Sequence, residues 1–236
     1  MPRLAAVQSS YVPWKGYFDL IAAVDEFVLY DDVQYTKHDW RNRNRIKTRE
    51  GVRWLTIPVR TTGRFGQRIN QVELVGPHWA RRHLRSLRQA YAGAPAFCDL
   101  LPWLEDVYQR AEQEQRLSRI NELFVRELCA LLGITTRITR AADHRLPQGR
   151  VERLVELCRQ RGADEYLSGP AARSYLDEEA FSTAGIGVRW MDYDGYLEYP
   201  QLWPPFEHRV SVLDLLVHVG VEAAPCYLCR TAGSGR

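Results

Sequence analysis

The sequence lacks membrane segments, secretory features and a disulfide pattern. In 236 residues no apolar run approaches the roughly eighteen residues that a membrane span requires. The opening MPRLAAVQSS has neither a long apolar segment nor a cleavage site of small residues, so we expect no secretory signal there. The five cysteines are odd in number and scattered, which argues against a disulfide framework. We therefore expect a cytoplasmic protein without a membrane segment.

Signatures of well-known catalytic sites are absent as well. The chain has no G-x-S-x-G, P-loop, H-E-x-x-H or G-x-G-x-x-G motif. The lone pair Cys226-x-x-Cys229 has no second pair to complete a zinc site, which leaves its role open. We expect no cofactor and no metal. The net charge of +3 is small and disfavours a general nucleic-acid binder.

What the sequence does contain is alternation of strands and helices at both ends of the chain. Residues 3–8, 16–24 and 26–30 predict a strand, a helix and a parallel neighbouring strand. The remaining predicted strands are 53–59, 69–75, 136–140, 165–168 and 188–193, and the remaining predicted helices are 77–93, 100–112, 117–132, 151–161, 177–184 and 211–219.

This pattern predicts an α/β fold with a mostly parallel sheet, built from βα units at both ends of the chain. A helical insertion at about 77–133 interrupts the alternation in the middle. We expect a single domain over residues 1–225, followed by a C-terminal tail over 226–236.

Two loops follow the first two predicted strands and should meet at one edge of the sheet, because ligands bind beyond the carboxyl ends of parallel strands. The first loop offers an amide, two rings and a close backbone approach, from Gln8, Tyr11, Trp14 and Gly16. The alternative for its rings is ordinary core packing around a proline turn.

The second loop begins with Asp31 and Asp32, which could hold a divalent metal, accept a proton, or orient Lys37 or Arg43; plain turn carboxylates are the alternative. The segment KHDWRNRNRIKTR then interleaves arginines with amides and a ring. Its expected binding residues are Trp40, Asn42, Arg43 and Asn44. This composition favours a phosphorylated, sugar-like or carboxylate-bearing small molecule.

The second half offers further polar positions after strands. Ser168 and Gly169 open a helix, where they suit either an anion site or a plain N-cap. A long aromatic loop that could cover a pocket contributes Asp192, Tyr199, Gln201 and, as a candidate general base, His208. The basic face of 77–93 is either simply solvated or attractive to an acidic partner.

The motifs together resemble the WbqC-like protein family. They are QSSYVPWKGYFDLI, DEFVLYDDVQYTKHDWRNRNRI and WLTIPV near the start, and YLSGPAARSYL through PPFEHRVSVLDLL near the end. The resemblance covers the chain to about Val221 and excludes the cysteine tail. The family usually has proline after the glutamine, where this chain has Ser9.

The resemblance implies a bacterial cytoplasmic protein of surface-polysaccharide or specialised-metabolite biosynthesis. The positions that match the family motif are Gln8, Tyr11, Trp14, Gly16, Asp31, Asp32, Lys37, Trp40, Asn42, Arg43 and Asn44. We expect them to form most of one binding site.

Three hypotheses follow. The first is a transferase that moves an acyl or aminoacyl group from an activated, carrier-bound donor to an amine such as an amino sugar. In it His208, Asp31 or Asp32 is the base, and Arg43 with Asn42 and Asn44 orients the donor and stabilises the oxyanion. The second is an ATP-dependent ligase or nucleotidylyl-type enzyme, and the third a non-catalytic subunit that binds an acidic carrier protein.

Overall fold

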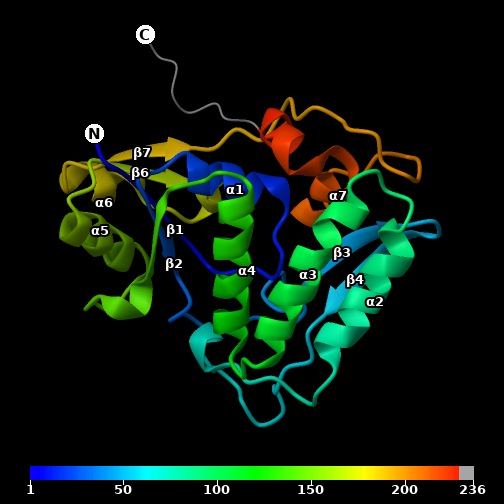
Figure 1. The fold of residues 1–236 in the computed structure, drawn as a ribbon. Coiled ribbons are helices and arrows are strands. Elements are labelled where there is room, and N and C mark those ends of the chain that lie inside the picture. The colour runs from blue at the N-terminus through cyan, green and yellow to red at the C-terminus, as the bar shows by residue number, and fades with distance from the viewer. Residues whose placement is uncertain (229–236) are drawn as a thin grey trace.

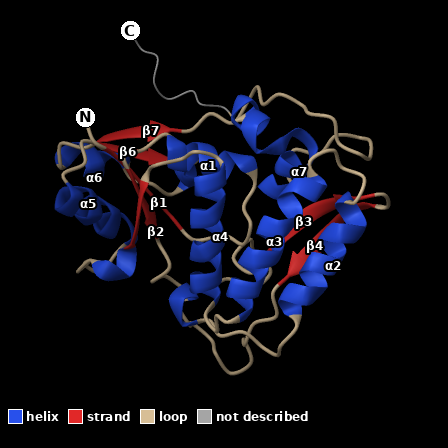
Figure 2. Cartoon of the chain, in the orientation of Figure 1, coloured by secondary structure: helices blue, strands red, loops and turns tan. Residues whose placement is uncertain are grey.

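The computed structural model describes residues 1–228 and is organised around a five-stranded parallel sheet (Figures 1 and 2). Its strands lie in the order β5-β2-β1-β6-β7. Their bounds are β1 Arg3–Val7, β2 Glu26–Leu29, β5 Arg137–Arg140, β6 Glu165–Ser168 and β7 Gly187–Trp190. The predicted α/β fold with a mostly parallel sheet is confirmed.

Helices cover both faces of this sheet, because its buried strands carry apolar residues on both sides. Ala5 and Phe27 pack with α1 (Lys15–Ala22) and α4 (Leu117–Leu131) in the larger core cluster. Leu4 and Val28 point the other way, toward α5 (Arg150–Arg161) and α6 (Glu178–Thr183) in a smaller cluster. The result is a three-layer arrangement with its main core on the α1 and α4 side.

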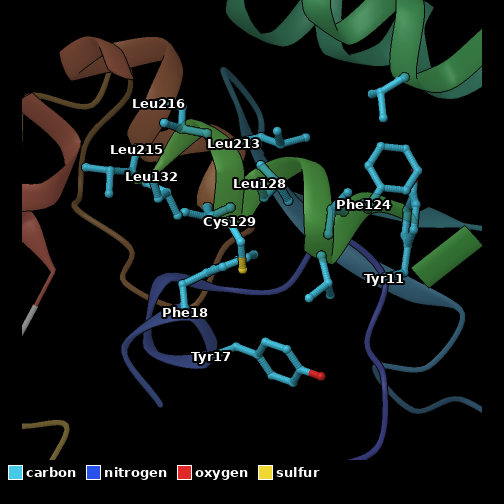
Figure 3. Packing of buried hydrophobic residues seen from close by; sticks show 14 of the residues in the cluster. Tyr11, Tyr17, Phe18, Phe124, Leu128, Cys129, Leu132, Leu213, Leu215 and Leu216 are labelled. Atoms are coloured by element: carbon cyan, nitrogen blue, oxygen red, sulfur yellow. The ribbon is translucent and has the colours of Figure 1, made fainter. Parts of the chain in front are cut away.

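Three of the predicted helices lie between the hairpin and β5, as expected. They are α2 (Trp79–Tyr91), α3 (Phe97–Glu112) and α4, and with α7 (Val212–Ala223) they enlarge the main core. Figure 3 shows how Phe124 and Leu128 of α4 lie between Tyr11 and the leucines of α7. The short 3-10 helices are η1 Ile69–Gln71, η2 Ala141–Asp143, η3 Pro170–Ser174 and η4 Ala224–Tyr227.

The region after β2 differs from the prediction. Residues 43–56 form an antiparallel hairpin of β3 (Arg43–Thr48) and β4 (Gly51–Thr56), separate from the main sheet. The predicted strand at 53–59 is therefore the second arm of this hairpin, and its first arm was missed. The predicted strand at 69–75 is wrong: the chain forms η1 there, followed by an isolated bridge between Val59 and Leu74.

The tail from residue 229, including Cys229, lies outside the described residues, whereas Cys226 is described and exposed. None of the helices within residues 1–228 is both long and apolar enough to cross a membrane.

Candidate functional site

The chain leaves β1 and β6 in opposite directions across the sheet. After β1 it crosses to β2, and after β6 it crosses to β7 on the other side. This divergence creates a crevice beyond the carboxyl ends of the strands, where open α/β sheets bind ligands. The loop after β1 therefore lies at the favoured place, as the sequence predicted.

A first cavity, of about 400 Å³, opens beside that loop. We name it the aromatic cavity; it is lined by Val7, Ser10, Pro13, Trp14, Tyr17, Trp40, Arg41, Asn44 and Arg209. Three rings and two guanidinium-bearing residues make it suitable for a ligand that is apolar over most of its length and polar at one end.

Trp14 and Gly16 act together at the wall of the aromatic cavity. A Cβ on Gly16 would lie 2.4 Å from Cζ2 of Trp14, so only glycine lets the indole lie flat against the start of α1. On its other sides the indole meets the rings of Tyr193 and Tyr196, at centroid distances of 5.1 and 5.8 Å. The predicted close approach at Gly16 exists, and a side chain of the protein occupies it.

A second cavity, of about 510 Å³, lies beyond β2 and β5. We name it the charged cavity; it is lined by Leu29, Asp31, Asp32, Arg68, Asn70, Gln71, Arg116, Ser118, Arg119, Glu122, Arg140, Ala142 and Asp143. Only Asp31 and Asp32 among these had been expected at the site. The others come from the end of β2, η1 and the residue before it, the start of α4, the end of β5 and η2, and no local motif joined those segments.

Asp31 is the most perturbed carboxyl group at this edge of the sheet. Its Oδ1 accepts the backbone N–H of Ser9 at 2.8 Å, and its side chain opens onto the charged cavity. Burial raises the pKa of Asp31 to about 6, and the Ser9 hydrogen bonds and the charge of Arg41 oppose that rise. A carboxyl group with this pKa can take up and release a proton near neutral pH.

The loop Gln8–Ser10 separates the two cavities and is fixed from several sides. Nη1 of Arg41 donates to the carbonyls of Gln8 (2.7 Å) and Ser9 (3.1 Å), and Asn121 Nδ2 donates to Ser9 Oγ (3.0 Å). Ser10 faces the aromatic cavity, and Ser9 holds Asp31 on the charged side. The structure brings Gln8 to this edge by its backbone, and its side chain is half-buried.

Three of the expected binding residues, Tyr11, Asn42 and Asn44, use their polar groups inside a buried framework of hydrogen bonds. Asn44 Nδ2 donates to the carbonyls of Tyr11 (3.0 Å) and Val12 (2.8 Å), and Asn42 Nδ2 donates to the carbonyl of Ile57 (2.8 Å). The Tyr11 side chain is fully buried, with its hydroxyl bonded to His83 and to Tyr108. Asn44 therefore holds the strand-end loop in shape and Tyr11 anchors it to α2 and α3, whereas Asn42 fixes the residue that follows β4.

Asp32 and Lys37 lie apart from each other. Asp32 forms an ion pair with Arg153 of α5, while its Oδ1 is buried without a hydrogen-bond partner in the described residues. Lys37 is exposed in the turn that precedes the hairpin. The predicted orientation of Lys37 by the aspartates does not appear among the contacts of either carboxylate.

Trp40 and Arg43 belong to an exposed cluster on the hairpin. The rings of Trp40 and Trp54 have centroids 5.2 Å apart, and the Arg43 guanidinium lies 4.1 Å from the Trp54 ring. Arg43 also donates to the carbonyl of His38. This cluster borders the aromatic cavity through Trp40, and Trp54 was not anticipated.

His208 precedes Arg209, a lining residue of the aromatic cavity, but is not itself among the lining residues. Burial, together with the charge of Lys15, lowers the pKa of His208, so its neutral form is favoured. Its ring packs against Phe206 at 4.6 Å, and its Nδ1 is buried without a hydrogen-bond partner in the described part of the chain. His208 is thus not among the residues that line the charged cavity with Asp31.

Tyr199 and Gln201 take part in a buried network around Asp214. The Tyr199 hydroxyl and Gln201 Nε2 both donate to Asp214 Oδ1, at 2.8 and 2.7 Å, and Tyr91 donates to Oδ2 at 2.8 Å. These donors satisfy a fully buried carboxylate, so this network fixes the aromatic loop against α7.

Ser168, Gly169 and Asp192 surround the end of β6. Ser168 is buried, and Gly169 lies close to the Tyr193 ring that packs on Trp14. Asp192 is exposed, and its Oδ1 accepts the N–H of Asp194 in the next turn. Within the described residues, no three histidine, cysteine, aspartate or glutamate side chains form a group that could hold a metal ion.

The basic face of α2 is partly neutralised by α3. Arg81 lies 3.7 Å from Glu112, and Arg88 pairs with Glu105. Arg82 and Arg85 are exposed and form no ion pair with the residues described. The face therefore keeps a smaller positive surface than the sequence alone suggested.

Comparisons with known proteins agree with the motifs. The model of the WbqC-like protein family matches residues 8–225. The uncharacterised protein Rv1507c of Mycobacterium tuberculosis is 52% identical over 232 residues, which cover 98% of this chain and 100% of that protein. No solved structure matches the chain.

Proposed function

Because the chain belongs to the WbqC-like protein family, we propose that it is a biosynthetic transferase of the kind its motifs suggested. It forms an amide or ester by moving an acyl or aminoacyl group from a carrier-bound donor to an acceptor such as an amino sugar. The observation that carries the proposal is the placement of Asp31. This buried carboxyl group opens onto a cavity large enough for a small acceptor, at the carboxyl edge of a parallel sheet.

Asp31 is the general base in this proposal. The acceptor enters the charged cavity as an ammonium ion, and the Asp31 carboxylate takes its proton to give the neutral amine. The amine nitrogen attacks the thioester carbonyl carbon of the donor, and the carbon–sulfur bond of the tetrahedral intermediate then breaks. Protonated Asp31 returns a proton to the leaving thiolate, and the amine's second proton leaves to solvent.

The oxyanion of the intermediate needs hydrogen-bond donors that are not already committed. Asn42 and Asn44 use their Nδ2 groups inside the framework, so the donor role expected for them passes to the arginines of the charged cavity. Arg119 and Arg140 line that cavity together with Asp31; each gives one N–H group to Glu122 and has further N–H groups for the oxyanion.

The aromatic cavity suits the extended arm of a carrier protein, whose acyl end then has to pass the loop Gln8–Ser10 to reach Asp31 in the charged cavity. The lining of the aromatic cavity includes the rings of Trp14, Tyr17 and Trp40. The exposed Arg209 is available for a polar end, whereas Arg41 already donates to the carbonyls of Gln8 and Ser9. The exposed arginines of α2, Arg82 and Arg85, are available to an acidic carrier surface. The partners in this proposal are thus a small amine or sugar and an acidic carrier protein.

The test is an incubation of the purified protein with acyl-loaded carrier proteins and a panel of amine acceptors, followed by intact mass measurement. We expect loss of the acyl group from the carrier and a matching mass gain on one acceptor, only when protein, carrier and acceptor are all present. A carrier that binds in a salt-sensitive manner but keeps its acyl group would instead identify a non-catalytic carrier-binding subunit.

An ATP-dependent ligase is the second candidate, favoured by the arginines of the charged cavity, which suit nucleotide phosphates. A thermal-shift screen with ATP and magnesium separates the two. A nucleotide at a hundredfold excess over its Kd stabilises a protein by about 2.7 kcal/mol. Activity that needs free ATP would replace the transferase proposal, whereas transfer from a preloaded carrier without ATP would exclude the ligase.

A further inference from the structure

The charged cavity is lined by four arginines (Arg68, Arg116, Arg119 and Arg140) and by four carboxylates (Asp31, Asp32, Glu122 and Asp143). The carboxylates that pair with three of these arginines are shared. Glu122, with only 8% of its side chain exposed, is shared by Arg119, Arg126 and Arg140. Glu73 is likewise shared by three arginines, including Arg116 of the cavity lining. One carboxylate neutralises one guanidinium, so each of these clusters keeps an excess of positive charge.

Further positive potential comes from Arg68 and from α4. The Arg68 guanidinium pairs with no carboxylate in the described part of the chain. Helix α4 begins in the cavity wall, and its first turn has neither an acidic residue nor a side-chain cap. The positive end of the helix dipole, together with the hydroxyl of Ser118, therefore faces the same space as the arginines.

The β2 side of the cavity has the opposite character. Oδ1 of Asp32 and Oδ1 of Asn70 are buried and have no hydrogen-bond partner in the described residues. Both residues line the cavity, beside Asp31. The two Oδ1 atoms have almost no accessible surface, so the acceptor that this wall presents to the cavity is the Asp31 carboxyl group, which suits a ligand that brings hydroxyl or ammonium groups.

Asp143, also in the lining, is the remaining carboxylate and is exposed, and its charge acts on Arg140. Asp32 is already paired with Arg153 on its other oxygen. The negative groups are therefore either paired or placed on the β2 and β5 side, away from the start of α4. One cavity thus combines an anion-binding wall with an acceptor wall.

We propose that the charged cavity binds a sugar phosphate whose ring carries amino or hydroxyl groups. The phosphate lies against Arg68, Arg116 and Ser118. The N–H groups of Leu117, Arg119 and Ile120 already donate to carbonyls, so the guanidinium groups and the N–H and hydroxyl of Ser118 bind the phosphate oxygens. The ring's donors lie against the Asp31 carboxyl group. The role of this sugar as acceptor of the transfer reaction rests on the proposed function, whereas the binding of the sugar phosphate does not depend on it.

Isothermal titration of the full-length protein with glucosamine 1-phosphate tests the site, with glucosamine and inorganic phosphate as the two separate halves of the ligand. We expect glucosamine 1-phosphate to bind at least about tenfold more tightly than either half, because both walls are then used at once. Titration with the uridine diphosphate ester of glucosamine identifies the source of the phosphate. Tighter binding indicates a nucleotide sugar and equal or weaker binding a simple sugar phosphate, and both results support the site.

Arg116 and Arg64 provide a matched pair of variants, because both lie by Glu73 but only Arg116 lines the cavity. Arg116→Gln and Arg68→Gln should each weaken binding about tenfold, whereas Arg64→Gln should leave it unchanged. No saturable binding by the sugar phosphates, or an equal loss in Arg64→Gln, would overturn the proposal. Tight binding without any acyl transfer would leave this site standing and remove the proposed function.

Discussion

Two groups of polar residues come from the same stretch of sequence and serve different purposes. In the framework around Asn44, the amide nitrogens donate to buried carbonyls, and the enclosed side chains are packed on all sides. In the charged cavity, Asp32 and Asn70 keep buried acceptors without donors, and Asp31 has a raised pKa. Asn42 Oδ1 in the framework also lacks a partner, so unsatisfied acceptors alone do not separate the two groups. What separates them is that the framework amides donate within the protein, whereas Asp31 and Asp32 line an open cavity and Asp31 has a raised pKa.

The largest effect is expected from breaking the framework. Asn44→Ala removes the donor to the carbonyls of Tyr11 and Val12, which would be left buried and unsatisfied. At about 1–3 kcal/mol for each such group, the free energy of unfolding should fall by about 4 kcal/mol. Urea denaturation at pH 7 measures it, and a loss below about 1 kcal/mol would show that Asn44 is not part of the framework.

The contribution of Asp31 to the free energy of unfolding should change with pH in the opposite sense to that of an ordinary salt-bridged carboxylate. Burial raises the pKa of Asp31 from 3.8 to about 6, so the folded protein binds the proton more tightly than the unfolded chain does. The resulting stabilisation is fully present below pH 3.8 and is lost as pH rises through about 6, a change on the order of 3 kcal/mol.

Asp31→Asn removes this titration. The difference in unfolding free energy between wild type and variant should therefore change by that amount between pH 4 and 7, in favour of the variant at pH 7. Both proteins are measured by urea denaturation over this range. A difference that stays constant with pH would show that Asp31 has an ordinary pKa.

Gly16→Ala probes the aromatic cavity, at a position where the backbone and the Trp14 ring leave no room for a Cβ. Displacing the indole should cost about 2 kcal/mol in unfolding free energy and change the shape of the cavity. Trp14 also contacts Tyr193 and Tyr196, so near-ultraviolet circular dichroism should change with it. An unchanged spectrum would show that the ring is not held by this packing.

The smallest effect is expected at Lys37. This residue lies in the same stretch of sequence as Asp31 and Asn44 but belongs neither to the framework nor to the charged cavity. Its side chain is exposed, so Lys37→Ala should change the unfolding free energy by less than about 0.5 kcal/mol. The same urea experiment serves as the control for Asn44→Ala. A loss comparable to that of Asn44→Ala would remove the distinction between framework and surface.

The sequence predicted the parallel sheet well, because its strands are short apolar runs between clear helices. It failed at β3, where Arg43–Thr48 alternates arginines with inward-facing Asn44 and Ile46. Both a ligand-binding ladder and a half-buried strand produce this alternation, and only the fold shows that Asn44 turns toward the carbonyls of Tyr11 and Val12.

The loops after β1 and β2 reach the sheet edge that the sequence predicted, but most residues that line the charged cavity were not named from the sequence. Asp31 and Asp32 follow β2 directly, so the strand-end rule located them. Arg68, Arg116 and Arg140 reach the same cavity from distant segments, and their convergence depends on how α4 and η1 pack beside the sheet. The only local sign was the arginine-rich start of α4, which a solvated helix end would also show.

The measurement that tests the central claim most directly is the rate of acyl transfer by wild type and Asp31→Asn as a function of pH. With the general base at Asp31, the wild-type rate should rise with pH around a midpoint near 6, and the variant should be slower by about a hundredfold or more. Urea denaturation establishes that the variant is folded. A folded Asp31→Asn protein with the wild-type rate and pH profile would contradict the account.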